Sequence, residues 1–186
     1  DLKSDREAKN FLLVQPNFEP HYEKFEFSEK QQLERIIRLV ESELSQNTDV
    51  LVLPETLFTV RLNRIEREPI FKQLSAWKKA YPQLQIITGL ATQRVLDDAE
   101  ESTQFTRTSE MGKGRTLRWE AGNVAYYLGP EGDSIYYKSK LVPGAEFFPY
   151  YRVLFLFEGI AKSLGGSMEG FRTQPEAQNF GEQTPL

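Results

Sequence analysis

The chain contains no cysteine and only one histidine among its 186 residues. Without cysteine, these residues cannot form a disulfide bond, a thiolate metal site or a cysteine nucleophile. The lone histidine, His21, cannot build a histidine-based metal site, and its ordinary role is that of a surface or turn residue. The sequence therefore predicts no metal site.

Positive charge and long hydrophobic runs are also scarce. The net charge is -4 and the isoelectric point is about 5.3, which argues against a nucleic-acid binder because such proteins carry a basic patch. No stretch of about 18 or more apolar residues is present, so nothing in this sequence predicts a membrane span. A glycine-rich phosphate-binding loop is absent as well, which argues against a nucleotide-binding enzyme.

What remains is the composition of one globular domain. Charged residues make up 27% and hydrophobic residues 39%, and a chain of this length can bury a substantial core. The sequence begins at Asp1 rather than at methionine, and it ends at Leu186 within the segment GEQTPL. We expect both ends to be cut from a longer protein, so the absence of targeting or membrane segments says little about the complete protein.

Two segments are predicted to be helical. Ser28 and Gln31 have the spacing of a capping box, and apolar residues recur at helical spacing through 33–44. A helix is therefore predicted over 28–46. Pro69 can begin a second helix, which Pro82 ends.

Short apolar runs predict strands between and after these helices. Buried strands are predicted within residues 10–18, where Pro16 ends the apolar run, over 50–53, and within 84–92, where the strand is expected to end at Gly89. Residues 93–118 are polar and predict a surface excursion or a ragged hairpin, and 122–140 predict a clear hairpin. An amphipathic helix is expected over 150–166, followed by a loop-like tail. This order of elements predicts a layered α/β fold.

Glu55 is the first candidate for chemistry. It follows the predicted strand that ends at Leu53, and functional groups in α/β sheets gather at the carboxyl ends of strands. A partly desolvated carboxylate at this place would suit a general base. The alternative is a structural acid that caps the next segment.

Lys138 is the second candidate, because it closes the predicted hairpin and could reach the same edge of the sheet. A protonated lysine beside a carboxylate can stabilise the oxyanion that forms during acyl transfer. It could also be a solvated hairpin lysine, and Lys140 must be weighed against it. Glu146 could orient Lys138 or a substrate amine, or it could be an ordinary surface acid.

Taken together, LPET at 53–56 and YYKSKLVPGAE at 136–146 resemble the carbon-nitrogen hydrolase, or nitrilase-like, superfamily. The VQPN segment near the start and the aromatic run after Glu146 are most similar to the apolipoprotein N-acyltransferase family. The residues KSKLVPGAE at 138–146 and LGG at 164–166 look most like those of its Bacteroidetes members. The resemblance covers essentially the whole chain. The Lys138 segment is fairly specific, whereas PET alone is weak.

The resemblance implies a four-layer α-β-β-α sandwich and a Glu-Lys-Cys triad. Glu55 matches the general base. Lys138, rather than Lys140, matches the catalytic lysine, because a tyrosine lies two residues before it and Leu-Val-Pro begins three residues after it. Glu146 matches a second acid that supports the intermediate or binds the incoming amine. Phe25 falls where the family often has tryptophan, so an aromatic ring is kept but an indole donor is lost.

The largest departure from the family is the missing cysteine. In the family it follows a strand entered just after a segment like TPL, which here is 184–186. We therefore expect the sequence to stop shortly before the nucleophile, and we expect this fragment alone to be inactive. A degenerate active site is the less favoured explanation, because Glu55, Lys138 and Glu146 are all kept.

The resemblance also implies a lipid reaction. Its partners would be a phospholipid acyl donor, a diacylglyceryl lipoprotein acceptor and the membrane, with no nucleic acid and no cofactor. The domain would lie on the periplasmic side of the bacterial inner membrane. Aromatic residues suit such an interface, although they could equally pack in the core. Those expected to form a substrate or lid surface are Phe25, near the site entrance, and Phe147, Phe148 and Tyr150.

Two rival functions remain open at the level of sequence. A soluble nitrilase-like amidase could use the same triad on a small-molecule amide or nitrile. A catalytically dead binding or scaffold module would keep the fold without a nucleophile.

Overall fold

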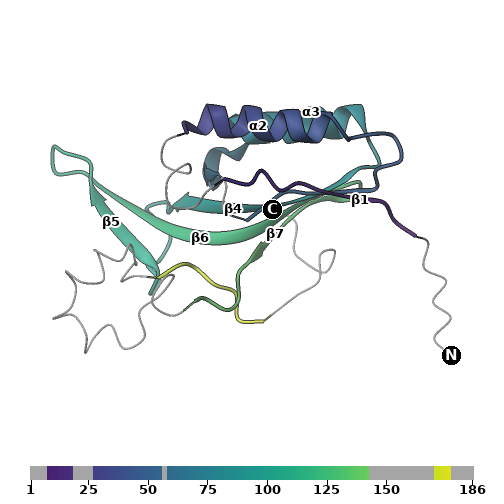
Figure 1. Ribbon diagram of the computed structural model, residues 1–186. Helices are drawn as coiled ribbons and strands as arrows, with labels where there is room; N and C mark the ends of the chain where they lie inside the picture. The colour runs from purple at the N-terminus through teal and green to yellow at the C-terminus, as the bar shows by residue number, and fades with distance from the viewer. Residues whose placement is uncertain (1–7, 19–26, 56–57, 143–169, 177–186) are drawn as a thin grey trace, which may run out of the picture.

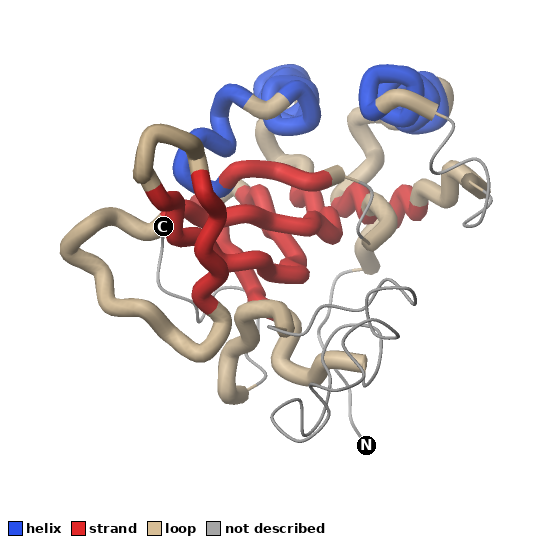
Figure 2. Tube along the Cα trace, turned by 90° about the vertical axis from the view of Figure 1, so that its left-hand side faces the viewer, coloured by secondary structure: helices blue, strands red, loops and turns tan. Residues whose placement is uncertain are grey.

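Two α-helices lie on one face of a curved seven-stranded sheet in the computed structural model, which describes residues 8–18, 27–55, 58–142 and 170–176 (Figure 1). The described residues thus form two layers, and the view in Figure 2 shows both helices on the same side of the sheet. The helices are α2 (Glu29–Glu41) and α3 (Pro69–Ala80), with a 3-10 segment, η1 (Leu62–Arg67), before α3. The predicted α/β class is confirmed at this level.

The sheet is mixed, with the order β1-β2-β4-β6-β5, β3 beside β4 and β7 beside β6. The first four strands run parallel to one another, whereas β6 is antiparallel to β4, β5 and β7. The strands are β1 (Phe11–Leu13), β2 (Val50–Val52), β3 (Thr59–Arg61), β4 (Gln85–Val95), β5 (Thr106–Glu110), β6 (Thr116–Gly129) and β7 (Gly132–Tyr137).

Local signals fix where α2 begins. The Ser28 hydroxyl accepts a hydrogen bond from the Gln31 backbone, and the Gln31 side chain accepts one from the Ser28 backbone at 2.9 Å. These two bonds satisfy donors that a helix N-terminus otherwise leaves free. Ile36 and Val40 are fully buried on the predicted apolar face. The helix is confirmed, but it ends at Glu41 rather than near residue 46.

The second helix also begins and ends close to its predicted limits. Pro69 is its first residue, and Tyr81 caps its C-terminus directly before Pro82. Leu74 and Trp77 are buried, and Phe71 meets Tyr126 of β6 edge to face, with ring centroids 5.2 Å apart. Packing of this helix on the central strands therefore anchors the helical layer.

Strands β4 and β6 form the longest pairing described in the sheet, which runs unbroken from Ile86↔Leu128 to Val95↔Trp119. Ile86, Leu90 and Val124 belong to the core shared with the helices. Successive side chains of a strand point to opposite faces. Gly89 and Asn123, which directly precede Leu90 and Val124 in the sequence, therefore face away from the helices.

The structure corrects two sequence predictions about strands and decides between two alternatives for a third region. Phe11 and Leu13 of β1 are 59% and 70% exposed, not buried, because β1 is an edge strand paired with β2. Strand β4 continues to Val95 instead of ending at Gly89, because β6 pairs along its whole length. The 93–118 region is the hairpin alternative, with β5 paired to the start of β6, and the strand β3 was not predicted.

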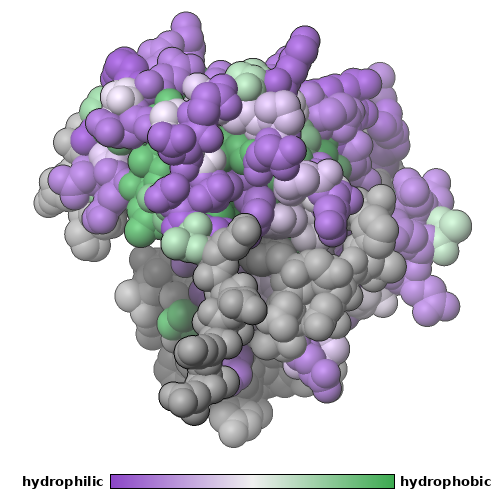
Figure 3. Space-filling model, turned by 90° about the vertical axis from the view of Figure 1, so that its right-hand side faces the viewer, coloured by the Kyte–Doolittle hydropathy of each residue, from purple (hydrophilic) through white to green (hydrophobic). Residues whose placement is uncertain are grey.

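The hairpin of β6 and β7 is confirmed, with Gly129 paired to Gly132 across a tight turn. Figure 3 shows the side of the molecule near β1, where the helical layer is mostly hydrophilic and hydrophobic side chains appear nearer the sheet. The helix expected over 150–166 lies outside the described residues. Within the described residues, no helix is long and apolar enough to cross a membrane.

Tyr126 makes the folding stability of the protein depend on pH in the alkaline range. Its side chain is 2% exposed, and its hydroxyl donates to Asp133 Oδ2 at 2.8 Å. Burial, followed by the hydrogen bond to Asp133, raises the pKa of Tyr126 far above its ordinary value. Since the folded-state pKa exceeds the unfolded value of about 10, the stability from this group is fully present below about pH 10 and is lost as the pH rises further.

We expect Tyr126→Phe to lower the free energy of unfolding by roughly 1.5–3 kcal/mol near pH 8, because a hydrogen bond to a carboxylate is lost. The difference from wild type should shrink at about pH 10.5, where ionisation penalises only the wild type. Urea unfolding at both pH values measures this. Tyr81→Phe, at a half-buried position, serves as the control. If the free energies of unfolding of wild type and Tyr126→Phe differed by the same amount at both pH values, the linkage would be contradicted.

Candidate active site

A break between two short strands positions Glu55. Strand β2 pairs with β4 at residues 85–87 and β3 pairs with it at 91–93, so the two lie end to end along one side of β4. Between them the chain crosses β4 at Gly89, whose backbone N–H donates to Pro54 O at 3.3 Å. Glu55 therefore follows β2 at the carboxyl end of a parallel strand, as the sequence predicts.

A second break, on the far side of β6, positions Lys138. Strand β7 pairs with β6 at residues 124–129 and β5 pairs with it at 116–120, which leaves 121–123 between them. Lys138 directly follows β7, and its backbone N–H donates to Asn123 O at 2.9 Å. Both breaks therefore flank the same unbroken pair of central strands.

The structure brings Glu55 and Lys138 together although they are 83 positions apart in the sequence. Lys138 Nζ lies 3.4 Å from Glu55 Oε1, and Asn123 Nδ2 donates to the same oxygen, also at 3.4 Å. The three side chains meet on the face of the sheet turned away from the helices, as the alternation along β4 and β6 requires. Lys140, two residues further on, is exposed.

Gly89 makes room for this arrangement. A Cβ at this position would overlap the Cα of Glu55 and would lie 3.2 Å from its Cβ. Only glycine lets the Pro54–Glu55 backbone pass this closely over β4. The sequence signal is an isolated glycine inside an apolar strand, which marks a close backbone approach rather than the predicted end of the strand.

The electrostatics of the pair are those of a surface site. The side chains of Glu55 and Lys138 are 63% and 30% exposed, so the desolvated carboxylate predicted from sequence is not seen. Ion pairs in such surroundings typically contribute about 0–1 kcal/mol to stability. Folding therefore depends little on this pair, and its geometry is the more informative property.

The arrangement places a proton acceptor, a cation and an amide donor around one small volume. A carboxylate can accept a proton from a nucleophile, and the neighbouring ammonium can stabilise an oxyanion that forms next to it. Asn123 was not predicted from sequence, and its only signal was a polar residue within an apolar strand. It contacts the Glu55 side chain and the Lys138 backbone, so it links the two breaks.

The other predicted site residues lie outside the described residues, and their roles stay predictions; these are Phe25, Glu146, Phe147, Phe148 and Tyr150. In the part of the chain that the structure describes, no group of three or more histidine, aspartate or glutamate side chains is placed to hold a metal ion.

Neither a family model nor a curated protein sequence matches this chain.

Proposed function

We propose that this chain belongs to the periplasmic catalytic domain of an apolipoprotein N-acyltransferase. It would transfer an acyl chain from a phospholipid to the N-terminal amine of a diacylglyceryl-cysteine in a lipoprotein. The observation that carries the proposal is the 3.4 Å approach of Lys138 Nζ to Glu55 Oε1. The resemblance to nitrilase-like enzymes requires these two residues to share a pocket, and the proximity supports that requirement.

The first half of the proposed reaction acylates the enzyme. The Glu55 carboxylate takes the proton from the thiol of a cysteine outside these residues, and the thiolate attacks an ester carbonyl of the phospholipid. The Lys138 ammonium stabilises the tetrahedral oxyanion. As the carbonyl reforms, the ester C–O bond breaks, Glu55 returns its proton to the leaving oxygen, and a lysophospholipid departs from the thioester.

The second half transfers the acyl chain to the acceptor. The α-amino group of the diacylglyceryl-cysteine attacks the thioester carbonyl, and Glu55 accepts a proton from the nitrogen. The C–S bond breaks, the thiolate regains that proton, and the amide product leaves. Glu146 would support the intermediate or bind the amine. The aromatic residues from Phe147 to Tyr151 would contact the acyl chains at the membrane surface.

The proposal extends to the fold and its location. The two described layers would form half of a four-layer α-β-β-α sandwich, and the domain would sit on the periplasmic side of the bacterial inner membrane. The face of the sheet that carries Glu55 and Asn123 would then turn toward the second sheet, with the candidate site at its margin.

The experiment uses the full-length protein in detergent micelles, with a phospholipid carrying a labelled acyl chain and a diacylglyceryl-cysteine peptide. We expect label to move to the peptide as an amide. Without peptide, a labelled thioester on the enzyme should accumulate, because a ping-pong reaction stalls there. Hydrolysis of small amides without lipid transfer would favour the soluble amidase, and the absence of both reactions would favour a binding module.

A further inference from the structure

Residues 170–176 fill the break between β5 and β7. Arg172 forms a parallel bridge with Gly122, and its backbone N–H donates to Ala121 O at 2.7 Å. At the start of this segment, Arg107 Nη2 donates to Gly170 O at 2.9 Å. Figure 1 shows the segment in yellow, passing below β6 close to β7. A distant part of the chain therefore completes the edge of β6 directly beside the residue that precedes Lys138.

The segment holds Tyr137 by two contacts. Gln174 Oε1 accepts a hydrogen bond from the Tyr137 backbone N–H at 3.0 Å, and the guanidinium carbon of Arg172 lies 5.0 Å from the centroid of the Tyr137 ring. Lys138 is thus fixed on one side by Asn123 of β6 and is preceded by a residue that the segment grips. A shift of Tyr137 would move the lysine backbone with it.

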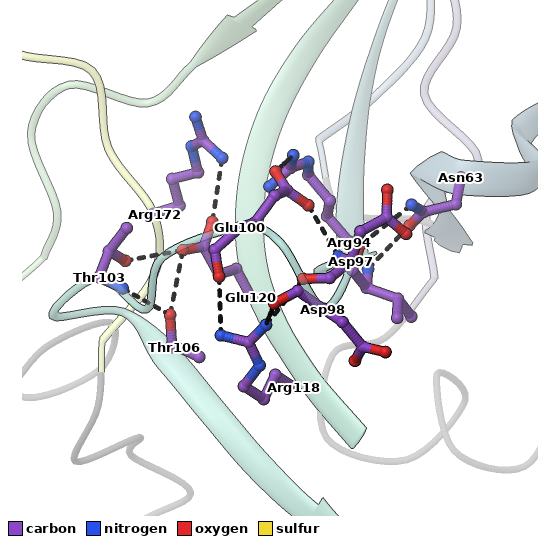
Figure 4. A network of polar contacts seen from close by, with 11 residues as sticks. Asn63, Arg94, Asp97, Asp98, Glu100, Thr103, Thr106, Arg118, Glu120 and Arg172 are labelled. Atoms are coloured by element: carbon purple, nitrogen blue, oxygen red, sulfur yellow. Dashed lines mark hydrogen bonds and ion pairs between the residues drawn. The ribbon is translucent and has the colours of Figure 1, made fainter. Parts of the chain in front are cut away.

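Arg172 is itself fixed by a buried acid. Its Nη1 lies 2.9 Å from Glu120 Oε2, and the Glu120 side chain is 1% exposed. The other Glu120 oxygen accepts hydrogen bonds from the hydroxyls of Thr103 at 2.7 Å and Thr106 at 3.4 Å, as Figure 4 shows. A buried carboxylate must be paired and hydrogen-bonded to be tolerated. This need gives Arg172 a defined position rather than a mobile one.

We propose that residues 170–176 act as a clamp that positions Lys138 beside Glu55. Arg172 and Gln174 are its positioning residues, and Glu120 locks Arg172 in place. This inference rests on the proposed function, because it assigns the clamp to the lysine of that reaction. It accounts for a polar segment that returns to the sheet beside the site and bonds the backbone one residue before Lys138.

The main test is Gln174→Ala in the full-length protein. The substitution removes the side chain that accepts from Tyr137 but leaves the Glu120–Arg172 pair intact, so no buried charge is exposed. We expect kcat for acyl transfer to fall about tenfold, with KM within about twofold, because small displacements of a reacting group are costly. Amide hydrogen exchange at Tyr137 should accelerate by about tenfold, because a protecting hydrogen bond is lost.

A second variant and a control separate positioning from stability. Arg172→Lys keeps the charge opposite Glu120 but loses the planar group over Tyr137, so it should lower kcat by a similar factor. Arg118→Lys disturbs the same polar network, since Arg118 donates to the backbone oxygens of Asp97, Asp98 and Glu100. None of the contacts described for Arg118 is to Tyr137, so the kcat of Arg118→Lys should stay within about twofold of wild type.

The outcomes distinguish the clamp from the proposed function. Active wild-type protein with a Gln174→Ala kcat equal to that of Arg118→Lys would overturn the clamp alone. A faster Tyr137 exchange without loss of kcat would also overturn it, because the contact would exist without positioning the lysine. A wild-type protein that transfers no acyl chain would overturn the proposed function, and the clamp would fall with it.

Discussion

Glu55→Gln in the full-length protein is expected to reduce acyl transfer by about 10²–10⁴-fold, the range typical for loss of a general base. Glutamine keeps the size of the side chain but cannot accept the proton of a thiol. The pair with Lys138 is partly exposed, so its loss should cost at most about 1 kcal/mol and shift Tm by only a few degrees. Folded but inactive protein is therefore the expected result, measured by lipid transfer and by thermal unfolding.

Lys138→Ala should reduce transfer by a similar factor, roughly 10²–10³-fold, because an oxyanion stabiliser is removed. Lys140→Ala is the matched control, since this lysine lies two residues away and is exposed. Its transfer rate should stay within a few-fold of wild type. Near-normal turnover by Glu55→Gln or Lys138→Ala would remove those residues from the mechanism, and equal losses at the two lysines would undo the assignment of Lys138.

Gly89→Ala should both destabilise the protein and impair transfer, although the new group is a single methyl. In a strand, glycine is usually less favourable than alanine by about 0.5–1 kcal/mol, so propensity alone predicts that this change stabilises. The methyl would overlap backbone of Glu55, which cannot rotate away. We expect the opposite sign, a loss of about 1–3 kcal/mol, as for other overpacked sites.

The same substitution should lower kcat by about 10²-fold, because Glu55 must move away from Lys138 to relieve the overlap. Ala91→Gly, two residues along β4 and on the same face, is the control. It should cost about 0.5–1 kcal/mol in stability and leave kcat near wild type. Urea unfolding and the transfer assay measure both effects, and an unchanged or stabilised Gly89→Ala protein would show that the close approach is not required.

The starts of α2 and α3 could be predicted because their signals are local. Ser28 and Gln31 fix the start of α2 within three residues of sequence, and Pro69 does the same for α3. The limits of the strands could not be predicted in the same way, since β4 gains its second half from pairing with β6 rather than from its own apolar residues. Long-range pairing of this kind leaves little trace in a short window of sequence.

Part of the candidate site followed from the same reasoning. Glu55 and Lys138 could be expected to meet, because one follows a buried parallel strand and the other ends a hairpin. Asn123 and Arg172 could not, because their positions depend on which segments fill the breaks beside β4 and β6. Glu120 offered no useful signal either, since a glutamate in a strand ordinarily faces water, and its burial depends on Arg172 arriving from 52 residues away.

The breaks in the strands beside β4 and β6 separate the rigid centre of the sheet from the candidate site. The long β4–β6 ladder holds the register of the whole layer, while the side chains of the candidate site lie where neighbouring strands stop and restart. Connections at such interruptions can change in length or composition without shifting the residue pairing of β4 with β6. Changes in these connections are therefore expected to alter the donor or acceptor of the proposed acyl transfer, while the β4–β6 scaffold stays constant.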